Sequence, residues 1–190
     1  MTLIILGLAL WSFLHFMPAT KARFRSKLIK SLGPNIYAGI FALGLIGSIA
    51  LMSMGWRAAD QWAIYTLPEW TALPGLALVL LGVILFGFGF DKRMQTNLKR
   101  HIQHLQLTGM LLWASGHLIL NGDNRSVLLF GGLGLWALIM RGLVNRRDGA
   151  WNKPEKVPFG REFVPAIIAL GFVAGFVFGH PYLSGVALFN

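Results

Sequence analysis

Residues 72–90 read ALPGLALVLLGVILFGFGF, nineteen consecutive residues without a charged side chain. A helix needs about 20 apolar residues to cross the hydrocarbon layer of a bilayer. Across the whole chain, 55% of the 190 residues are hydrophobic and 13% are charged, which is more apolar surface than one soluble core can bury. The sequence therefore predicts an all-α polytopic membrane protein, a bundle of six transmembrane helices forming one integral membrane domain over residues 1–190. The predicted spans are 2–19, 34–54, 72–90, 104–121, 126–144 and 163–186.

The positive charges predict the orientation of these spans. The net charge of +10 would suggest nucleic acid as a partner if the protein were soluble, but the charged residues lie between the apolar runs. The partner expected from this pattern is the lipid bilayer, and no nucleic acid is expected. The first, third and fifth connections hold fifteen Lys and Arg residues, whereas the second and fourth hold one each, Arg57 and Arg125. By the positive-inside rule, the odd connections are cytoplasmic, and the N- and C-termini lie on the opposite, non-cytoplasmic side of the membrane.

Other patterns have architectural interpretations. The apolar start of the chain lacks a basic leading region and is followed by Lys and Arg rather than a small-residue cleavage site, so it is expected to be the first span. The second connection is rich in aromatic residues of the kind that settle at headgroup level, namely Trp56, Trp62, Tyr65 and Trp70. The last span has a glycine at every fourth residue, which would let another helix approach closely, at Gly171, Gly175 and Gly179.

Two histidines within the predicted spans suggest a cofactor site. His15 and His117 each follow a tryptophan by four residues, Trp11 and Trp113, so imidazole and indole share one helix face. Gly116 removes bulk beside the second imidazole. The chain has no cysteine, which excludes thiolate ligands. Imidazole is a strong axial ligand for haem iron, so two such histidines on facing helices could hold a six-coordinate haem b. The alternative is that each imidazole only hydrogen-bonds a neighbouring helix.

Two further histidines are weaker candidates for iron ligands. His104, near the start of the fourth span, could pair with His15, and His180, near the end of the sixth, could pair with His117. These pairs matter because His15 should lie near the cytoplasmic edge of the membrane and His117 nearer the outer edge, with a difference in depth of about 10 Å. Helix tilt could reduce that difference.

Five stretches of the sequence are similar to stretches found in one family of membrane proteins. They are RHIQH at 100–104, WASGHLILNGD at 113–123, Trp136 on the following span, His15 followed by Pro18-Ala19, and LGPNIY at 32–37. Through them the chain resembles the NnrU family, over about the first 147 residues closely and over the last span more loosely. The resemblance implies a bacterial inner-membrane protein associated with denitrification, in particular with the use of nitrite and nitric oxide.

The resemblance also bears on the cofactor. A relative of this family, the zeta-carotene isomerase of plants and cyanobacteria, carries haem b through histidines in positions similar to His15 and His117. The isomerase has a cysteine three residues before its second histidine, and this chain has Ala114 there. In the family, the histidine matching His104 is usually followed by proline, and here Leu105 follows.

Three functions are expected in this order. The first is an NnrU-like haem b protein with His15 and His117 as iron ligands, Trp11 and Trp113 beside the macrocycle, and a redox or accessory role in nitrite and nitric oxide respiration, with a respiratory or nitric oxide reductase complex as a partner. The second is a haem-dependent cis-trans isomerase of a carotenoid-like polyene. The third is a haem-free membrane assembly or interaction subunit. Whether the protein is an enzyme is left open.

Overall fold

The computed structural model describes residues 1–91 and 93–188, and within them the chain is helical. The described α-helices are α1 (Thr2–Thr20), α2 (Ala22–Leu32), α3 (Pro34–Ala58), α4 (Ala72–Phe88), α5 (Leu105–Leu120), α6 (Asn124–Asp148) and α7 (Phe163–Ser184). Three short 3-10 helices adjoin them, η1 (Glu69–Thr71), η2 (Asn97–Arg100) and η3 (Phe159–Glu162).

The predicted class, an all-α polytopic membrane protein, is confirmed. Five helices are long and apolar enough to span a bilayer: α1, α3, α4 with η1, α6 and α7 with η3. Many large apolar side chains point outward from these helices, as the hydrocarbon layer requires. The expected fourth span differs, because α5 has only 16 residues, about 24 Å of helix. It is therefore shorter than the usual bilayer thickness.

The helices also depart from the predicted spans at their ends. α3 and α6 each have 25 residues and continue past the apolar run into Arg57 and into Arg146 and Arg147. Backbone hydrogen bonding carries a helix beyond the membrane edge, where charged side chains are well solvated. The first connection, for which the sequence analysis predicted no secondary structure, contains the helix α2.

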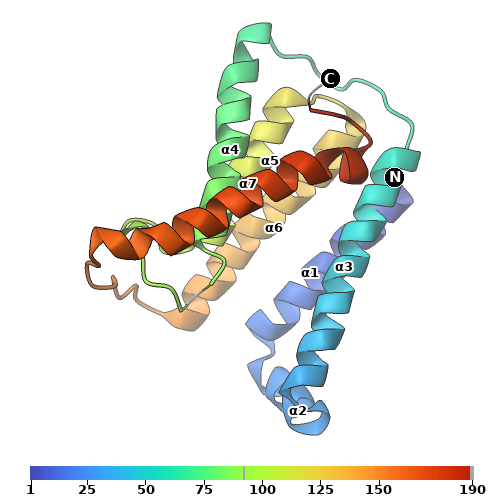
Figure 1. Cartoon of the computed structure of the whole chain (residues 1–190). Coiled ribbons are helices and arrows are strands. Elements are labelled where there is room, and N and C mark those ends of the chain that lie inside the picture. The colour runs from blue at the N-terminus through green and yellow to red at the C-terminus, as the bar shows by residue number, and fades with distance from the viewer. Residues whose placement is uncertain (92, 189–190) are drawn as a thin grey trace.

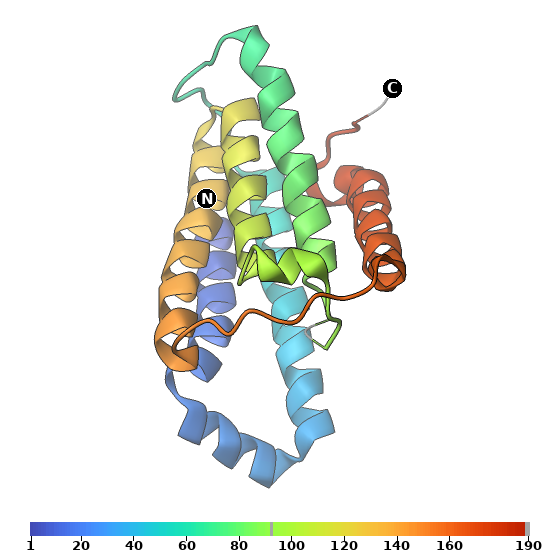
Figure 2. The same cartoon turned by 90° about the vertical axis from the view of Figure 1, so that its left-hand side faces the viewer.

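Two groups of helices make up the bundle (Figure 1). α1 lies against α3, while α5 packs between α4 and α6. α6 also contacts α1 and so joins the two groups. α7 runs obliquely across the face of the bundle, packing on α4 and reaching the end of α3. Figure 2 shows α2 lying across one end of the α1 and α3 pair.

Glycines set the close approach of α4 and α5. A Cβ atom at Gly82 would lie 2.6 Å from the carbonyl oxygen of Gly109, and one at Gly109 would lie 2.5 Å from the carbonyl oxygen of Gly82. The two backbones are therefore in direct contact, as small residues allow in membrane bundles. α4 approaches α7 as closely at Gly87, where a Cβ atom would lie 2.5 Å from Cα of Ala169.

The odd-numbered and even-numbered connections lie at opposite ends of the bundle. At one end, Asn97 of the third connection donates its side-chain N–H to the carbonyl of Val157 in the fifth, at 2.9 Å. At the other end, the side chain of Asn124 donates to the carbonyl of Asp60, at 3.1 Å. The ends of the chain meet here as well, because Ser53 of α3 bonds the carbonyl of Leu183 and Gly55 lies against Ile4. The cationic connections thus share one end; Lys92, counted among them, lies outside the described residues.

Candidate intramembrane histidine site

His15 on α1 lies among aromatic rings from three helices. Its ring centroid is 4.4 Å from that of Trp11, one turn earlier on α1. Trp136 of α6 approaches edge-on at 4.9 Å, and Phe41 of α3 approaches at 5.8 Å. The imidazole is half-buried at the place where α6 contacts α1.

His117 on α5 has a similar environment. Its ring centroid is 4.5 Å from that of Trp113, and Phe130 of α6 stacks on it at 4.3 Å. Trp113 in turn contacts Phe130 at 5.0 Å and Phe176 of α7 at 6.5 Å. Both expected tryptophan and histidine pairs are therefore formed, each against a different aromatic residue of α6.

The two imidazoles have the same hydrogen bond and hence the same available nitrogen. Nδ1 of His15 is 2.8 Å from the carbonyl oxygen of Trp11, and Nδ1 of His117 is 2.9 Å from that of Trp113. A carbonyl can only accept, so Nδ1 carries the proton in a neutral ring and Nε2 keeps its lone pair. Among the described residues, Nε2 of neither histidine has a hydrogen-bond partner. This arrangement orients an imidazole to bind a metal through Nε2.

Indole groups beside His15 also lack partners. The Nε1 atoms of Trp11 and Trp136 are buried and have no hydrogen-bond partner in the described part of the chain. Their rings are 5.4 Å apart. A buried N–H without an acceptor is destabilising, so this cluster could accommodate a ligand that accepts hydrogen bonds.

The two histidines lie at different heights along α6. Their contacts on that helix, Trp136 and Phe130, are six residues apart, a rise of about 9 Å. Six residues also turn the helix through about 600°, so these two side chains leave it in directions about 120° apart. The difference in height matches that expected from the sequence.

The space that Gly116 leaves is filled by a helix. A Cβ atom there would lie 2.6 Å from the carbonyl oxygen of Gly75 and 2.8 Å from the backbone nitrogen of Val79, both on α4. Gly116 therefore allows α4 to pack on α5, and the space beside it holds protein backbone rather than room for a macrocycle.

His104 and His180 have other partners. His104 precedes α5, and its Nε2 is 2.7 Å from Oδ1 of Asn145. His180, near the end of α7, places Nδ1 2.8 Å from the carbonyl oxygen of Val186. His180 also lies one turn after Phe176, the α7 residue that contacts Trp113 beside His117. Of the two weaker candidates, His180 is thus the one that the structure places near a proposed ligand.

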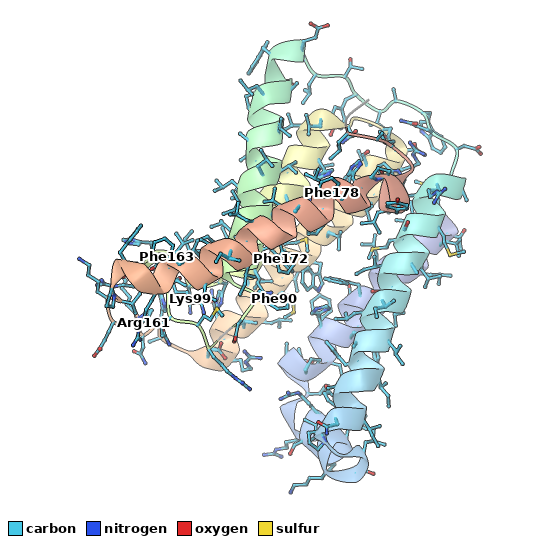
Figure 3. All side chains as sticks on the ribbon, viewed as in Figure 1. Phe90, Lys99, Arg161, Phe163, Phe172 and Phe178 are labelled. Atoms are coloured by element: carbon cyan, nitrogen blue, oxygen red, sulfur yellow. The ribbon has the colours of Figure 1, made fainter. Side chains whose placement is uncertain are left out.

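α7 presents an open groove beside the His117 cluster. The groove has a volume of about 510 Å³ and is lined by Ile168, Gly171, Phe172, Gly175, Phe176 and Leu183. A Cβ atom at Gly171, Gly175 or Gly179 would meet no described atom within 4 Å, so no helix of this chain packs on that face. α7 instead contacts α4 through Ala169 and through Phe172, whose ring centroid is 5.6 Å from that of Phe86. Phe172 also contacts Phe90, just after α4, at 5.1 Å (Figure 3).

Sequence reasoning missed the part that α6 contributes to the site. Trp136 figured only in the family resemblance, and Phe130 was not singled out. Both lie on the buried face of α6 with Leu133, Ala137 and Met140. An interior aromatic on a strongly apolar helix has no sequence signal that distinguishes it from a lipid-facing one.

The fold and these side chains define a polytopic all-α membrane protein with paired histidine and aromatic clusters inside its helix bundle. A model of the family described as NnrU protein matches residues 3–188, so the chain belongs to the NnrU family. The match includes the last span, where the resemblance was expected to be loose. Neither a curated protein nor a solved structure matches the chain significantly.

Proposed function

We propose that this NnrU family member is a haem b protein of the bacterial inner membrane with a redox or accessory role in nitrite and nitric oxide respiration. His15 and His117 are its proposed axial ligands. The observation that carries the proposal is that both imidazoles donate Nδ1–H to a carbonyl one turn earlier and keep Nε2 available. An unpaired polar atom at membrane depth is costly, and coordination of iron would satisfy it.

Aromatic residues beside the two imidazoles support the same proposal. Trp11 and Trp113 provide apolar faces beside the two imidazoles. The unpartnered indole N–H groups of Trp11 and Trp136 could donate to the carboxylates that haem b carries. Bound haem would supply one-electron chemistry, whose potential the protein tunes through the axial ligands and the polarity around them.

Substitution of single histidines identifies which two of them bind the haem iron. His15 and His117 contact α6 at positions six residues apart, and His180 lies one turn after Phe176, which contacts Trp113 beside His117. If one haem is held by His15 and His117, alanine at either position removes six-coordinate iron. If His117 and His180 form the pair instead, His15→Ala leaves the cofactor in place.

The test is the absorption spectrum of protein purified from haem-replete cells, oxidised and then reduced with dithionite, together with the pyridine haemochrome. We expect a Soret band and sharp α and β bands, lost or broadened in His15→Ala and His117→Ala. His104→Ala is the matched control, because its Nε2 already contacts Asn145, and it should retain the bands. A colourless preparation of the wild-type protein would exclude the proposed haem.

The proposed orientation follows from the charges. Fifteen of the seventeen Lys and Arg residues fall in the odd connections, which supports a cytoplasmic location for that end and periplasmic termini. Alkaline phosphatase fused after the last residue should be active, and the same enzyme inserted in the connection between α6 and α7 should be inactive. The reverse pattern would invert the topology.

A second candidate is an assembly role, favoured by the open glycine face of α7. Gly171, Gly175 and Gly179 contact no helix of this chain, so a membrane helix of a respiratory partner such as a nitric oxide reductase complex could pack there. Gly175→Leu should then abolish co-purification of that complex while the haem spectrum stays unchanged. The polyene isomerase is less favoured, because Ala114 supplies no thiolate.

A further inference from the structure

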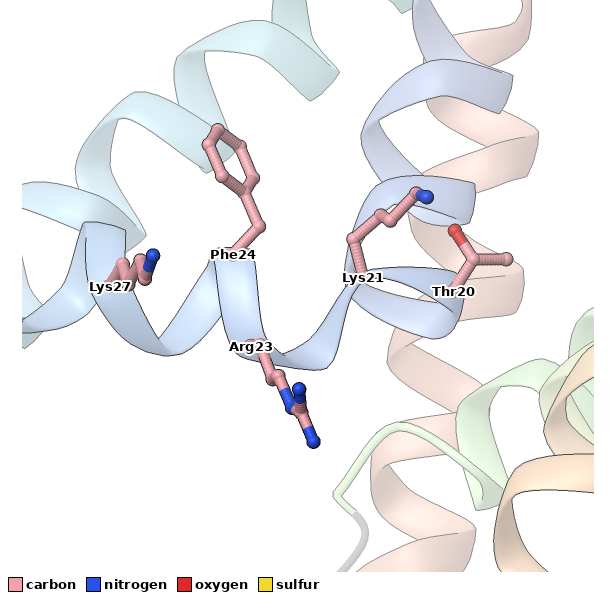
Figure 4. Close-up of a pocket in the computed structure, with 5 residues that line it drawn as sticks. All are labelled: Thr20, Lys21, Arg23, Phe24 and Lys27. Atoms are coloured by element: carbon pink, nitrogen blue, oxygen red, sulfur yellow. The ribbon is translucent and has the colours of Figure 1, made fainter.

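α2 is an amphipathic helix at the edge of the bundle. Arg23, Lys27 and Lys30 are spaced by four and three residues and share one face. Phe24, Leu28 and Leu32 are spaced by four residues and form the other face, beside which Arg25 lies over the ring of Tyr37. The close-up in Figure 4 shows Arg23 and Phe24 extending to opposite sides of the helix. This separation of charge from apolar surface is typical of helices that lie in a membrane interface.

The apolar face of α2 is not covered by the rest of the protein. Phe24 is 51% exposed and Leu32 is 37% exposed. α2 packs on the adjoining ends of α1 and α3, and it lies across that end of the pair (Figure 2). Two exposed apolar side chains on a helix across the membrane boundary are positioned to enter the acyl region.

The positive charges of α2 form no ion pair within the described part of the chain. The first acidic residue of the chain is Asp60, and the ion pairs found among the described residues lie on α6 and just before it. Where α1 turns into α2, Thr20, Lys21, Arg23, Phe24 and Lys27 line a cavity of about 520 Å³ (Figure 4). Three cationic residues thus contribute to the lining of one open space, and of these Arg23 extends to the side of α2 opposite Phe24.

We propose that this corner binds the headgroup of an anionic phospholipid, with the acyl chains passing beside Phe24. The headgroup supplies a negative partner for Lys21, Arg23 and Lys27. The acyl chains cover the side chain of Phe24, which a soluble anion would leave exposed. Basic residues at a membrane surface each strengthen binding to anionic lipid by about fivefold. The bound lipid therefore anchors α2 to the membrane, across the ends of α1 and α3.

The experiment is a titration of the full-length protein in dodecyl maltoside with phosphatidylglycerol or phosphatidylcholine, followed by native mass spectrometry. We expect the first phosphatidylglycerol to bind at least about tenfold more tightly than phosphatidylcholine. The triple variant Lys21→Gln, Arg23→Gln, Lys27→Gln should reduce that preference to less than about threefold. All three side chains are exposed, so helical content measured by circular dichroism should not change.

Two further variants keep the outcome interpretable. A control triple variant removes the same charge from the same end of the bundle by Lys153→Gln, Lys156→Gln and Arg161→Gln. It should leave the preference for phosphatidylglycerol within about twofold of the wild-type value. Phe24→Ser retains every cation. It should weaken the binding of phosphatidylglycerol without affecting the binding of inorganic phosphate, which is the probe for a free anion. Equal binding of the two lipids by the wild type, or an equal loss in the control triple, would overturn the proposal. An unchanged Phe24→Ser variant would assign the corner to a free anion, and would overturn it as well.

Discussion

The indole of Trp136 on α6 meets the imidazole of His15 on α1 edge-on, with ring centroids 4.9 Å apart. Trp136 is only 6% exposed and also contacts Trp11. It belongs to a buried cluster with Ala137 and Met140, against which side chains of α1 and α5 pack. This contact is one of those through which α6 joins the pair of α1 and α3 to the group of α4, α5 and α6.

Trp136→Ala should destabilise the fold. Removing a buried tryptophan leaves a cavity that the bundle cannot close, at a cost of about 3–5 kcal/mol. The neighbouring substitution Leu135→Ala is the control, because Leu135 is 59% exposed and faces away from the protein. Thermal unfolding in detergent measures both. A similar decrease for the two variants would mean that Trp136 does not hold α1 to α6.

Gly82→Val should disrupt the packing of α4 on α5. A Cβ atom at Gly82 would lie 2.6 Å from both the carbonyl oxygen of Gly109 and the backbone nitrogen of Trp113. Backbone atoms cannot move aside as a flexible side chain does, so we expect a loss of about 3 kcal/mol or more. Gly171→Val adds the same side chain where no atom lies within 4 Å. Its stability, measured by unfolding in detergent, should be nearly that of wild type.

Asp123 should make stability depend on acid pH. Its carboxylate caps α6, accepting hydrogen bonds from the backbone N–H groups of Arg125 and Ser126 and from the Ser126 hydroxyl. Burial raises the pKa of Asp123, but the hydrogen bonds from Ser126 and Arg125 and the charge of Arg125 outweigh burial and hold this pKa below its usual value. A carboxylate with a lowered pKa stabilises the fold above the unfolded value of 3.8, and this contribution is lost as pH falls through the folded value.

Unfolding of Asp123 variants between pH 3 and 7 checks this. Asp123→Ala removes the cap and should cost about 1 kcal/mol at pH 7. Asp123→Asn keeps an accepting oxygen, so we expect a smaller loss and no titration near pH 4. Asp60→Asn, at an exposed position in the preceding outer connection, should retain the wild-type pH profile. A wild-type profile in Asp123→Asn would assign the acid sensitivity to another group.

Tyr65→Phe should loosen the connection between α3 and α4. The Tyr65 hydroxyl donates to the carbonyl of Leu118 at the end of α5. Burial and the charge of Asp123 raise the pKa of Tyr65, so the hydroxyl remains a donor in neutral and mildly basic solution. Its loss leaves a carbonyl without this partner, at a cost of about 1 kcal/mol. Limited proteolysis from the side of this connection should cut Tyr65→Phe faster than wild type, and equal rates would contradict the role.

Apolar run length and charge position were sufficient to predict the class of fold. Uncharged stretches such as 72–90 have no stable location except within lipid, so the all-α membrane bundle followed from composition and spacing. Averaging hydropathy along the sequence could not predict α2, because a short basic helix has low mean hydropathy. Such a helix is stabilised by an interface rather than by its own length.

The sequence by itself also determined which polar residues enter the membrane and that each histidine faces the same way as the tryptophan one turn before it, since helix geometry is local. Only the tertiary structure decided what lies opposite those faces: Trp136 and Phe130 beside the imidazoles, and α4 in the space beside Gly116. The reason is that lipid and protein interior are equally apolar. No hydrophobic pattern tells the inner face of a membrane helix from its outer face, and close contact between particular side chains selects one packing.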